Sequence, residues 1–445
     1  MIIELLVLLG ILLISIELQK HFKIPSPVSL IALSYLLYYL HPSLILFDQE
    51  NFAELVIFLI PILITADALQ LDLEDLKKNA WSLLFLAVLA VVISVILGII
   101  TTNTFFSQYN LSTGAIIALF AMVLATDPVS VVSVFSSFKV SHKLKILAEG
   151  ESLFNDATAL IIFSFIAIPM IEGADITPMY ITLISLKVII LSILIGLIVG
   201  FLAVQLMRTT QEDMSELVII ILSAYGSFEL AEHFEVSGLL AVIVAVITLN
   251  TITQKSLKSA DRRIRQSKRI INKTNQKRKI FSKRFMSGIT AKLSSDITEM
   301  EQHKLNLKYI SVLALLANAF LFFSMASIVH VSILLHYKYE ILWMFIVTTI
   351  IRALLMGGFA FTSNITKKMT DISFRWWSVL LFAGIKGGLS IVMLQMLPEH
   401  FEHKELFEAI VTGVILLSTF SYAFILVLII TLNKQAFEKE TSLHH

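Results

Sequence analysis

The residues best suited to chemistry are polar side chains that interrupt long apolar runs. Asp127 precedes Pro128 in one run, and the next run carries Ser152, Asn155 and Asp156. The last three have the spacing i, i+3 and i+4, so a helix would present them on one face. Oxygens from carboxylates, hydroxyls and backbone carbonyls are the ligands that small hard cations prefer. The spacing therefore predicts a cation site, with a polar seam that joins two helices as the alternative.

The run that contains Asp127 is predicted to break inside the apolar region. Pro128 lacks a backbone donor and clashes with the preceding turn, so carbonyl groups near Thr126 lose their helical partners. At membrane depth such groups are tolerated only against protein or a cavity. We therefore expect two half-helices whose exposed backbone contributes oxygens to the cation site. The alternative is a simple proline kink, with Asp127 bonded to its own chain.

A second break is predicted around Lys386, which lies between Gly384 and the pair Gly387 and Gly388. Glycines weaken a helix, so this run should also be interrupted. Interrupted segments in corresponding positions of two halves of a chain mark the binding site of many transporters. Both breaks would expose half-helix ends, where Asp127 offsets the positive ends and Lys386 the negative ones.

Two further ionisable residues lie in apolar runs. Arg352 is always charged, so at this depth its guanidinium needs a carboxylate or carbonyl partner. Asp67 stands at the end of an earlier run. We expect it to act either as a gate or as a residue at the rim of the pathway.

The elements that hold these residues must be membrane helices. The chain has 445 residues, of which 57% are hydrophobic and 15% charged, whereas soluble domains carry about 25% charged residues. A bilayer core needs about 20 apolar residues per helix. The sequence predicts an all-α polytopic membrane protein of thirteen transmembrane helices, at residues 2–18, 24–41, 52–69, 80–101, 113–137, 147–170, 178–206, 215–232, 236–250, 307–330, 338–360, 375–398 and 405–433. The absence of cysteine excludes disulfide frameworks and thiolate sites.

Lysine and arginine predict how the chain is oriented. One alternating set of loops is basic, whereas the opposite set holds only Lys338 and Lys404 beside several acids. The positive-inside rule then places the N-terminus outside and the C-terminus in the cytoplasm. We expect the protein to lie in the cell inner membrane.

The interval 251–306 is predicted to be a basic cytoplasmic loop. Residues 251–308 contain 16 of the 34 Lys and Arg residues and only four acids. Stretches such as Arg262–Ile271 would either lie as a basic helix on anionic lipid headgroups or belong to a solvated loop that only sets the topology. Nucleic-acid binding is not expected, because few aromatic residues interleave these cations.

In their order along the chain, these elements resemble the electroneutral branch of the cation:proton antiporter superfamily, which includes the bacterial NhaP and animal NHE sodium/proton exchangers. The resemblance is carried by residues 67–76, 125–128, 149–158, 237–244 and 384–390 and by Arg352. No single segment is specific to the family, but their order and their placement on the thirteen predicted helices are. The chain departs from the family at Asp67, where the family usually has glutamate, and at Lys386, where it usually has arginine.

The resemblance implies roles for individual residues. Asp156 would carry the cation and the proton, and Asn155 would support it. Asp127, Ser152 and Thr126 would help to form the site, and Glu151 would pair with Arg352.

The resemblance also implies the fold. We expect one transmembrane domain of two inverted repeats, with the two broken helices crossing at mid-membrane. A six-helix core would comprise about 80–170 and 338–433, and a scaffold with the homodimer interface would comprise about 1–69 and 178–330. No cofactor is expected.

The function expected from these features is exchange of Na⁺ or Li⁺ for H⁺ by alternating access, with both ions competing for Asp156. Since Asn155 is not a second titrating carboxylate, exchange should be one for one and electroneutral. A K⁺/H⁺ antiporter or a sodium-coupled solute symporter is the alternative within transport. An intramembrane aspartyl protease also needs two aspartates, but the neighbours of Asp127 and Asp156 do not match its motifs. A membrane scaffold without transport would not explain so many buried ionisable groups.

Overall fold

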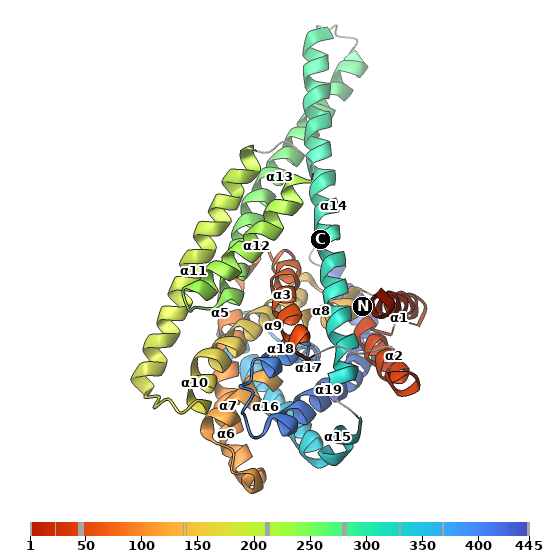
Figure 1. Ribbon diagram of the computed structural model, residues 1–445. Helices are drawn as coiled ribbons and strands as arrows, with labels where there is room; N and C mark the ends of the chain where they lie inside the picture. Colours follow the sequence, from red (N-terminus) through yellow and green to blue (C-terminus); the bar gives the residue numbers. More distant parts are fainter. Residues whose placement is uncertain are drawn as a thin grey trace. The chain divides into compact units, whose positions relative to one another are not determined.

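A computed structural model describes residues 2–22, 24–42, 49–136, 138, 140–209, 214–277, 283–328, 331–366 and 369–442. The regular secondary structure of these residues is entirely helical, without strands (Figure 1). Helices suit an apolar solvent because each backbone donor and acceptor is satisfied within its own segment. The predicted all-α class is confirmed. Residues 278–282 of the predicted basic loop lie outside the described residues.

The helices follow one another through short connections, and some are interrupted by a π-helical or 3-10 turn. In chain order they are α1 Ile2–Phe22, α2 Ser26–Leu40, α3 Gln49–Ala68, α4 Leu73–Lys78, α5 Ala80–Leu84, π-helical η2 Phe85–Leu89, α6 Ala90–Phe105, 3-10 η3 Ser107–Tyr109, α7 Thr113–Leu124, α8 Pro128–Ser136, α9 His142–Ile162, π-helical η4 Phe163–Ala167 and α10 Ile168–Ile171. The later ones are α11 Pro178–Thr209, α12 Ser215–His233, α13 Gly238–Lys277, α14 Lys283–Ile328, α15 Val331–His336, α16 Lys338–Ile365, α17 Phe374–Phe382, α18 Gly388–Gln395, α19 Lys404–Leu432 and α20 Lys434–Ser442.

The predicted apolar runs coincide with these elements. Each run lies on one helix or on a consecutive set such as α7 with α8 or α17 with α18. Within the part of the chain that the structure describes, eight helical spans are long and apolar enough to cross a bilayer by length and composition. Shorter apolar helices accompany them at Ser26–Leu40 and Leu55–Ala68. The chain is therefore a multi-pass membrane protein, while the number of thirteen crossings stays a prediction.

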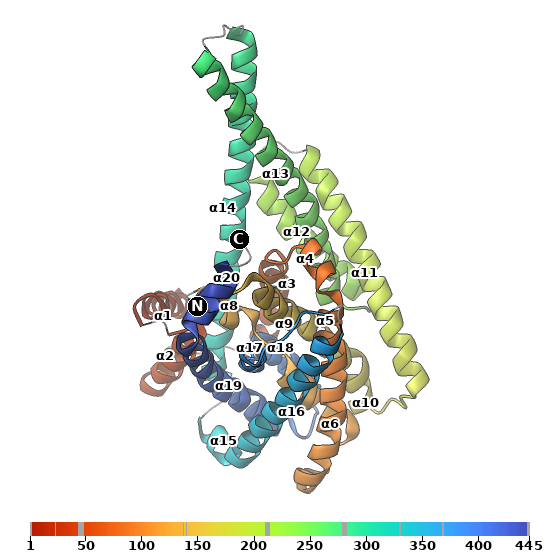
Figure 2. The ribbon, with the colours of Figure 1, turned by 180° about the vertical axis from the view of Figure 1, so that it is seen from behind.

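One compact unit comprises Met1–Leu63, Glu74–Ile190 and Leu315–His445. It contains both broken helices, α7 with α8 and α17 with α18 (Figure 2). Helix α9 packs against α7 and α8, and α19 packs against all four half-helices. The predicted core ranges 80–170 and 338–433 both fall in this unit, together with part of the predicted scaffold, residues 1–63.

The second compact unit comprises Ile64–Leu73 and Leu191–Ala314. In it α11 approaches α13 closely through Gly196 and Gly200, where an added Cβ would lie 2.6 Å from the carbonyl oxygens of Ala241 and Ala245. Two glycines four residues apart on one face are a common device for close helix packing in membranes. The small residues of this pair of helices therefore fix how near their backbones come.

The basic interval adopts a regular structure. Residues 251–277 continue α13 and residues 283–306 begin α14, so the polar composition does not interrupt the helices (Figure 1). Arg263 holds the two helices together by donating to both carboxylate oxygens of Asp296, with the shortest contact, from Nη2, at 2.6 Å. The interval is a helical hairpin over the residues described.

Candidate functional site

The first break lies where Pro128 predicted it. Helix α7 ends at Leu124 and α8 begins at Pro128, with the non-helical residues 125–127 between them. The Asp127 carboxylate caps α8: it accepts from the Val129 and Ser130 amides at 3.0 and 3.2 Å and from the Ser130 hydroxyl. A carboxylate at a helix N-terminus also offsets the positive end of the helix dipole. The prediction that this run breaks is confirmed, and the Asp127 side chain faces α8.

The second break lies around Lys386. Helix α17 ends at Phe382 and α18 begins at Gly388, so residues 383–387 connect two half-helices. The two breaks meet directly, because the Asp127 amide donates to the Ile385 carbonyl at 2.7 Å. The predicted crossing of two interrupted helices is confirmed.

Two glycines allow the breaks to meet. A Cβ added at Gly387 would overlap the Cα and side chain of Asp127, and one added at Gly384 would overlap the guanidinium of Arg352. In both cases the nearest atom would lie under 3.0 Å away, and both neighbours are held by other hydrogen bonds, so neither can move away freely. The glycines around Lys386 therefore serve close approach as well as interruption of the helix.

Gly387→Ala should destabilise the protein by about 1–3 kcal/mol, the usual cost of an inserted methyl in a packed region. The matched control is Gly358→Ala in α16, where an added Cβ meets nothing within 4 Å. We expect the control to be neutral or slightly stabilising, since alanine favours helix. Thermal unfolding of both variants in the same detergent checks the prediction. Equal melting temperatures would show that the breaks do not pack as described.

The predicted cation-binding residues gather beside the first break. The Thr126 amide donates to Asp156 Oδ1 at 2.8 Å, and the Thr126 hydroxyl lies 2.8 Å from the Ser152 hydroxyl. Asn155 Nδ2 donates to the Leu124 carbonyl at 3.0 Å and to the Thr126 hydroxyl at 3.3 Å. Asp156 is half-buried, and its Oδ2 accepts no hydrogen bond from the residues described. One carboxylate oxygen is thus fixed while the other is available to a ligand.

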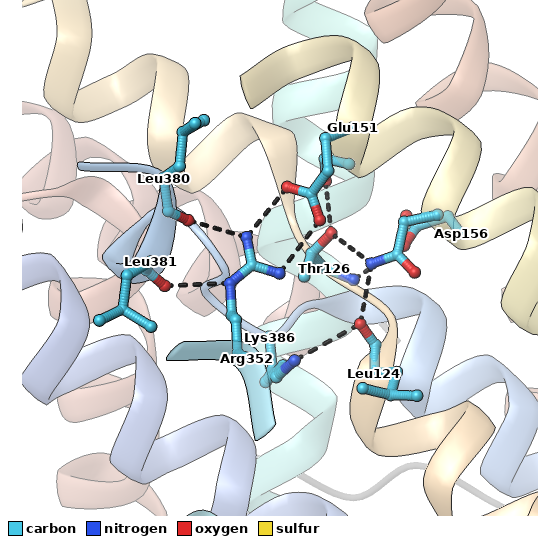
Figure 3. Close-up of polar contacts among 10 residues, drawn as sticks. Leu124, Thr126, Glu151, Asp156, Arg352, Leu380, Leu381 and Lys386 are labelled. Atoms are coloured by element: carbon cyan, nitrogen blue, oxygen red, sulfur yellow. Dashed lines mark hydrogen bonds and ion pairs between the residues drawn. The ribbon is translucent and has the colours of Figure 1, made fainter. Parts of the chain in front are cut away.

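A buried ion pair lies next to this group. Arg352 Nη1 and Nη2 each donate to one oxygen of Glu151 at 3.0 Å, which is the bidentate geometry that suits a guanidinium. The same guanidinium donates to the carbonyls of Leu380 and Leu381 at 2.9 and 3.0 Å. Figure 3 shows Glu151 and these two carbonyls surrounding Arg352. Arg352 therefore neutralises Glu151 and at the same time satisfies the C-terminal end of α17.

Lys386 serves the C-terminal end of α7. Its Nζ lies 3.4 Å from the Leu124 carbonyl, the same oxygen that accepts from Asn155 (Figure 3). Its backbone amide donates to the Ser418 hydroxyl of α19 at 3.2 Å. A cation beside the last carbonyls of a helix is favourable because it meets the negative end of the dipole. Lys386 thus lies at the negative end of a half-helix, α7, as the sequence predicted.

A small cavity of about 20 Å³ reaches this group, and its polar lining includes Glu151, Asn155, Arg352 and Lys386. A volume of this kind can hold about one water molecule. Asn155 Oδ1 is buried and accepts no hydrogen bond from the residues described. The cavity therefore offers the unsatisfied amide oxygen room for one small polar ligand.

One predicted residue, Asp67, lies outside the compact unit that contains the breaks, and two residues at the breaks, Ser130 and Ser418, were not predicted. Asp67 lies near the C-terminal end of α3 in the second compact unit, so its role as a gate stays a prediction. Sequence reasoning missed Ser130 and Ser418. The motif Asp-Pro-x-x preceding an apolar run could have indicated a cap at Ser130, because polar residues in a first helical turn often bond to the residue before it. No local pattern indicated Ser418.

The sequence matches the family model described as "Sodium/hydrogen exchanger, transmembrane" over residues 5–268. The chain belongs to the sodium/hydrogen exchanger family. The match covers more than half of the chain and includes both Asp127 and Asp156. Membership in this family agrees with the geometry, in which two broken helices meet beside one available carboxylate.

Two curated relatives align over most of the chain. It is 28% identical to the Na⁺/H⁺ antiporter ApNhaP of Aphanothece halophytica over 365 residues, which are 81% of this chain and 61% of the relative. It is 30% identical to the Na⁺/H⁺ antiporter NhaG of Bacillus atrophaeus over 366 residues, which are 80% of this chain and 59% of that relative. The chain thus spans about three fifths of the length of these relatives.

The fold of this sodium/hydrogen exchanger family member matches that of a solved structure. The sodium proton antiporter MjNhaP1 from Methanocaldococcus jannaschii superimposes with a TM-score of 0.68, over 95% of this chain and 99% of the other, at 16% sequence identity. The comparison establishes the fold of the chain.

Proposed function

We propose that the protein exchanges Na⁺ or Li⁺ for H⁺ across the membrane at Asp156. The observation that carries this proposal is the Asp156 carboxylate beside the meeting point of two broken helices, with Oδ1 held by the Thr126 amide and Oδ2 without a hydrogen bond from the residues described. Family membership and the Na⁺/H⁺ antiporters to which the chain is similar support the same ions. A K⁺/H⁺ antiporter or a sodium-coupled solute symporter on a similar fold is the alternative.

The ligands of the cation come from this carboxylate and its neighbours. Besides Asp156, the hydroxyls of Thr126 and Ser152 lie together, so these three residues supply oxygens to one point. Asn155 holds Thr126 and the end of α7, which is a supporting role. Asp127 contributes mainly by capping α8, and this cap holds the non-helical backbone of residues 125–127 beside the ion.

Exchange follows from competition for one carboxylate. Asp156 binds either a partly dehydrated cation or a proton, and each loaded form is nearly neutral. The empty ionised form is costly to move through an apolar region, so it crosses poorly. The core, about 80–170 and 338–433, would then carry the loaded site past the scaffold, about 1–69 and 178–330. Cation and proton therefore move in opposite directions.

The oligomeric state follows from the resemblance to the family, and the orientation in the membrane follows from the distribution of Lys and Arg in the loops. We propose a homodimer in the cell inner membrane, with the N-terminus outside, the C-terminus in the cytoplasm and the basic interval 251–306 near anionic lipid. Site-directed labelling of single cysteines is unambiguous in this chain because it has no native cysteine. Cysteines placed in the loop after α10 and in the basic hairpin should react from opposite sides of the membrane.

The function is tested by reconstituting the purified full-length protein into vesicles and measuring pH changes driven by sodium, lithium and potassium gradients separately. We expect sodium or lithium to acidify or alkalinise the lumen according to the direction of the gradient. Response to potassium alone would select the alternative exchanger, and response to none of the three would overturn the proposal.

Exchange should be insensitive to membrane potential. One proton and one monovalent cation carry equal charge in opposite directions, and the neutral Asn155 adds no second titrating group next to Asp156. The rate should be the same when potassium and valinomycin clamp the membrane at zero or at an inside-negative potential. A rate that scales with the clamped potential would show that more than one proton moves per cation.

A further inference from the structure

A pocket of about 640 Å³ lies in the second compact unit, between the polar stretches of α13 and α14. Its walls are one face of α13 between Gln254 and Arg265 and one face of α14 between Met300 and Leu307. The apolar part of α13 ends at Leu249, so the pocket begins just beyond the stretch suited to the bilayer interior. In Figure 1 the two helices run side by side through this region. The pocket is separate from the cation site and its residues.

The walls of the pocket carry an excess of positive charge. Four cations line it, Lys258, Arg262, Arg265 and Lys304, against a single acid, Asp261. Arg265 pairs with Asp261 at 2.9 Å, and Lys258 pairs with Asp72 at 3.2 Å. Arg262 and Lys304 have no ion pair with an acid among the residues described, and both are exposed. Two cations, one on each helix, therefore lie in the pocket wall without an acidic partner among the residues described.

Two residues of the pocket wall, His303 and Gln254, belong to a polar cluster that is largely buried. His303 is 3% exposed, and its Nδ1 lies 2.5 Å from Glu216 Oε1 of α12, while its Nε2 lies 3.2 Å from Gln254 Nε2 of α13. Asn306 donates to the other Glu216 oxygen at 2.7 Å. Buried polar groups with satisfied hydrogen bonds impose one geometry on the helices that carry them. This cluster thus fixes the position of the two helices that carry Arg262 and Lys304.

The lining also has an apolar part. Leu257, Met300 and Leu307 contribute to the wall beside the cations. Pockets that hold small organic ligands have volumes of about 300–1,000 Å³ and combine apolar walls with a few placed polar groups. A guanidinium suits phosphate because its fork donates to two oxygens at once, and an ammonium adds a point charge. The chemistry favours a phosphate group attached to an organic body over a bare inorganic ion.

We propose that this pocket binds a phosphate-bearing organic anion between α13 and α14, with Arg262 and Lys304 as the groups that hold the phosphate. Two sources share this chemistry: the headgroup of an anionic phospholipid, reached from the adjacent membrane surface, and a soluble phosphorylated molecule, reached from water. Occupation of the pocket would tie the two helices together through the ligand. The site is independent of the exchange reaction and does not rest on it.

The test compares the full-length wild type with Arg262→Gln/Lys304→Gln and with the control Lys255→Gln/Lys308→Gln. The control removes the same charge from the same two helices at exposed positions that do not line the pocket. One arm measures equilibrium binding of radiolabelled ATP to protein in phosphatidylcholine nanodiscs. The other measures retention of phosphatidylglycerol against phosphatidylcholine on the detergent-purified protein by native mass spectrometry.

We expect saturable binding of one of the two probes at one per chain, weakened roughly tenfold or more in the pocket variant and within about twofold of wild type in the control. ATP binding would assign a soluble ligand, and phosphatidylglycerol retention a lipid headgroup. Melting temperatures near that of the wild type are expected for both variants, because all four residues are exposed. Saturable binding of neither probe, or equal weakening in the two variants, would overturn the proposal whether or not the protein exchanges ions.

Discussion

Asp156→Asn should reduce cation-driven proton movement in reconstituted vesicles to the level of vesicles without protein. The amide oxygen can still accept the hydrogen bond from the Thr126 backbone, so the geometry of the break should persist. The amide neither releases a proton nor offers a negative charge to a cation, so both halves of the exchange are lost. The melting temperature should stay close to that of the wild type, since the hydrogen bond from the Thr126 amide persists and Asp156 makes no direct ion pair among the residues described.

The matched control for this prediction is Glu172→Gln, which makes the same change at an exposed residue just after α10. It should exchange at the wild-type rate. Sodium-dependent proton flux that persists in Asp156→Asn would contradict the assignment of the carrier, and loss of flux in both variants would show that the effect is not specific to Asp156.

The second large effect is expected at the ion pair of Glu151 and Arg352. Removing one partner of a buried pair leaves the other charge uncompensated, at a cost of about 3–5 kcal/mol. Arg352→Met should cost more than Glu151→Gln, because the guanidinium also satisfies the carbonyls of Leu380 and Leu381. The double variant should be more stable than the sum of the single effects predicts, since no isolated charge remains.

Unfolding measurements on the two single variants and the double variant give the coupling energy of the pair. The surface pair of Arg375 and Glu440, 39% and 25% exposed at a distance of 2.8 Å, serves as the control. Loss of that pair should cost no more than about 1 kcal/mol, because water solvates the partner that remains. Simple additivity at Glu151 and Arg352 would mean that the two residues do not interact in the membrane-embedded protein.

Local sequence patterns predicted the breaks because their causes are local. Pro128 removes a donor and the glycines around Lys386 weaken a helix, whatever lies nearby. The spacing of Ser152, Asn155 and Asp156 likewise fixed their common face as soon as α9 was a helix. These residues account for the part of the site that could be predicted.

The partners of these groups could not be predicted in the same way. Asp127 and Ile385, or Arg352 and Leu380, meet through contacts between distant parts of the chain, and many pairings satisfy the same need for a carbonyl or a carboxylate. The direction of the Asp127 carboxylate depends on Ser130, whose hydroxyl competes with any cation for the same oxygen. Tertiary packing selects among these pairings, and a single segment of the sequence does not determine that packing.

The basic interval shows a different limit. Its polar composition predicted a loop, because loops between membrane helices are polar. Outside the bilayer a helix can be polar all round when its own residues pair and a neighbour packs against it. Pairs such as Arg265 with Asp261 along α13 and Arg263 with Asp296 across to α14 meet both conditions. Composition therefore located the interval and its charge, and the helical hairpin required tertiary contacts.

The central claim is that a cation and a proton compete for the one carboxylate of Asp156. The most direct test measures uptake of radioactive sodium into reconstituted vesicles over a range of external pH and extracts the sodium concentration that gives half-maximal rate. If a single group binds either ion, this concentration should rise about tenfold for each unit by which the pH falls below the pKa of that group, because protons then occupy most sites. It should level off at higher pH, where the carboxylate is ionised, with the maximal rate little changed at saturating sodium. A half-saturating sodium concentration that stays constant as the pH falls, while only the maximal rate declines, would contradict competition at Asp156.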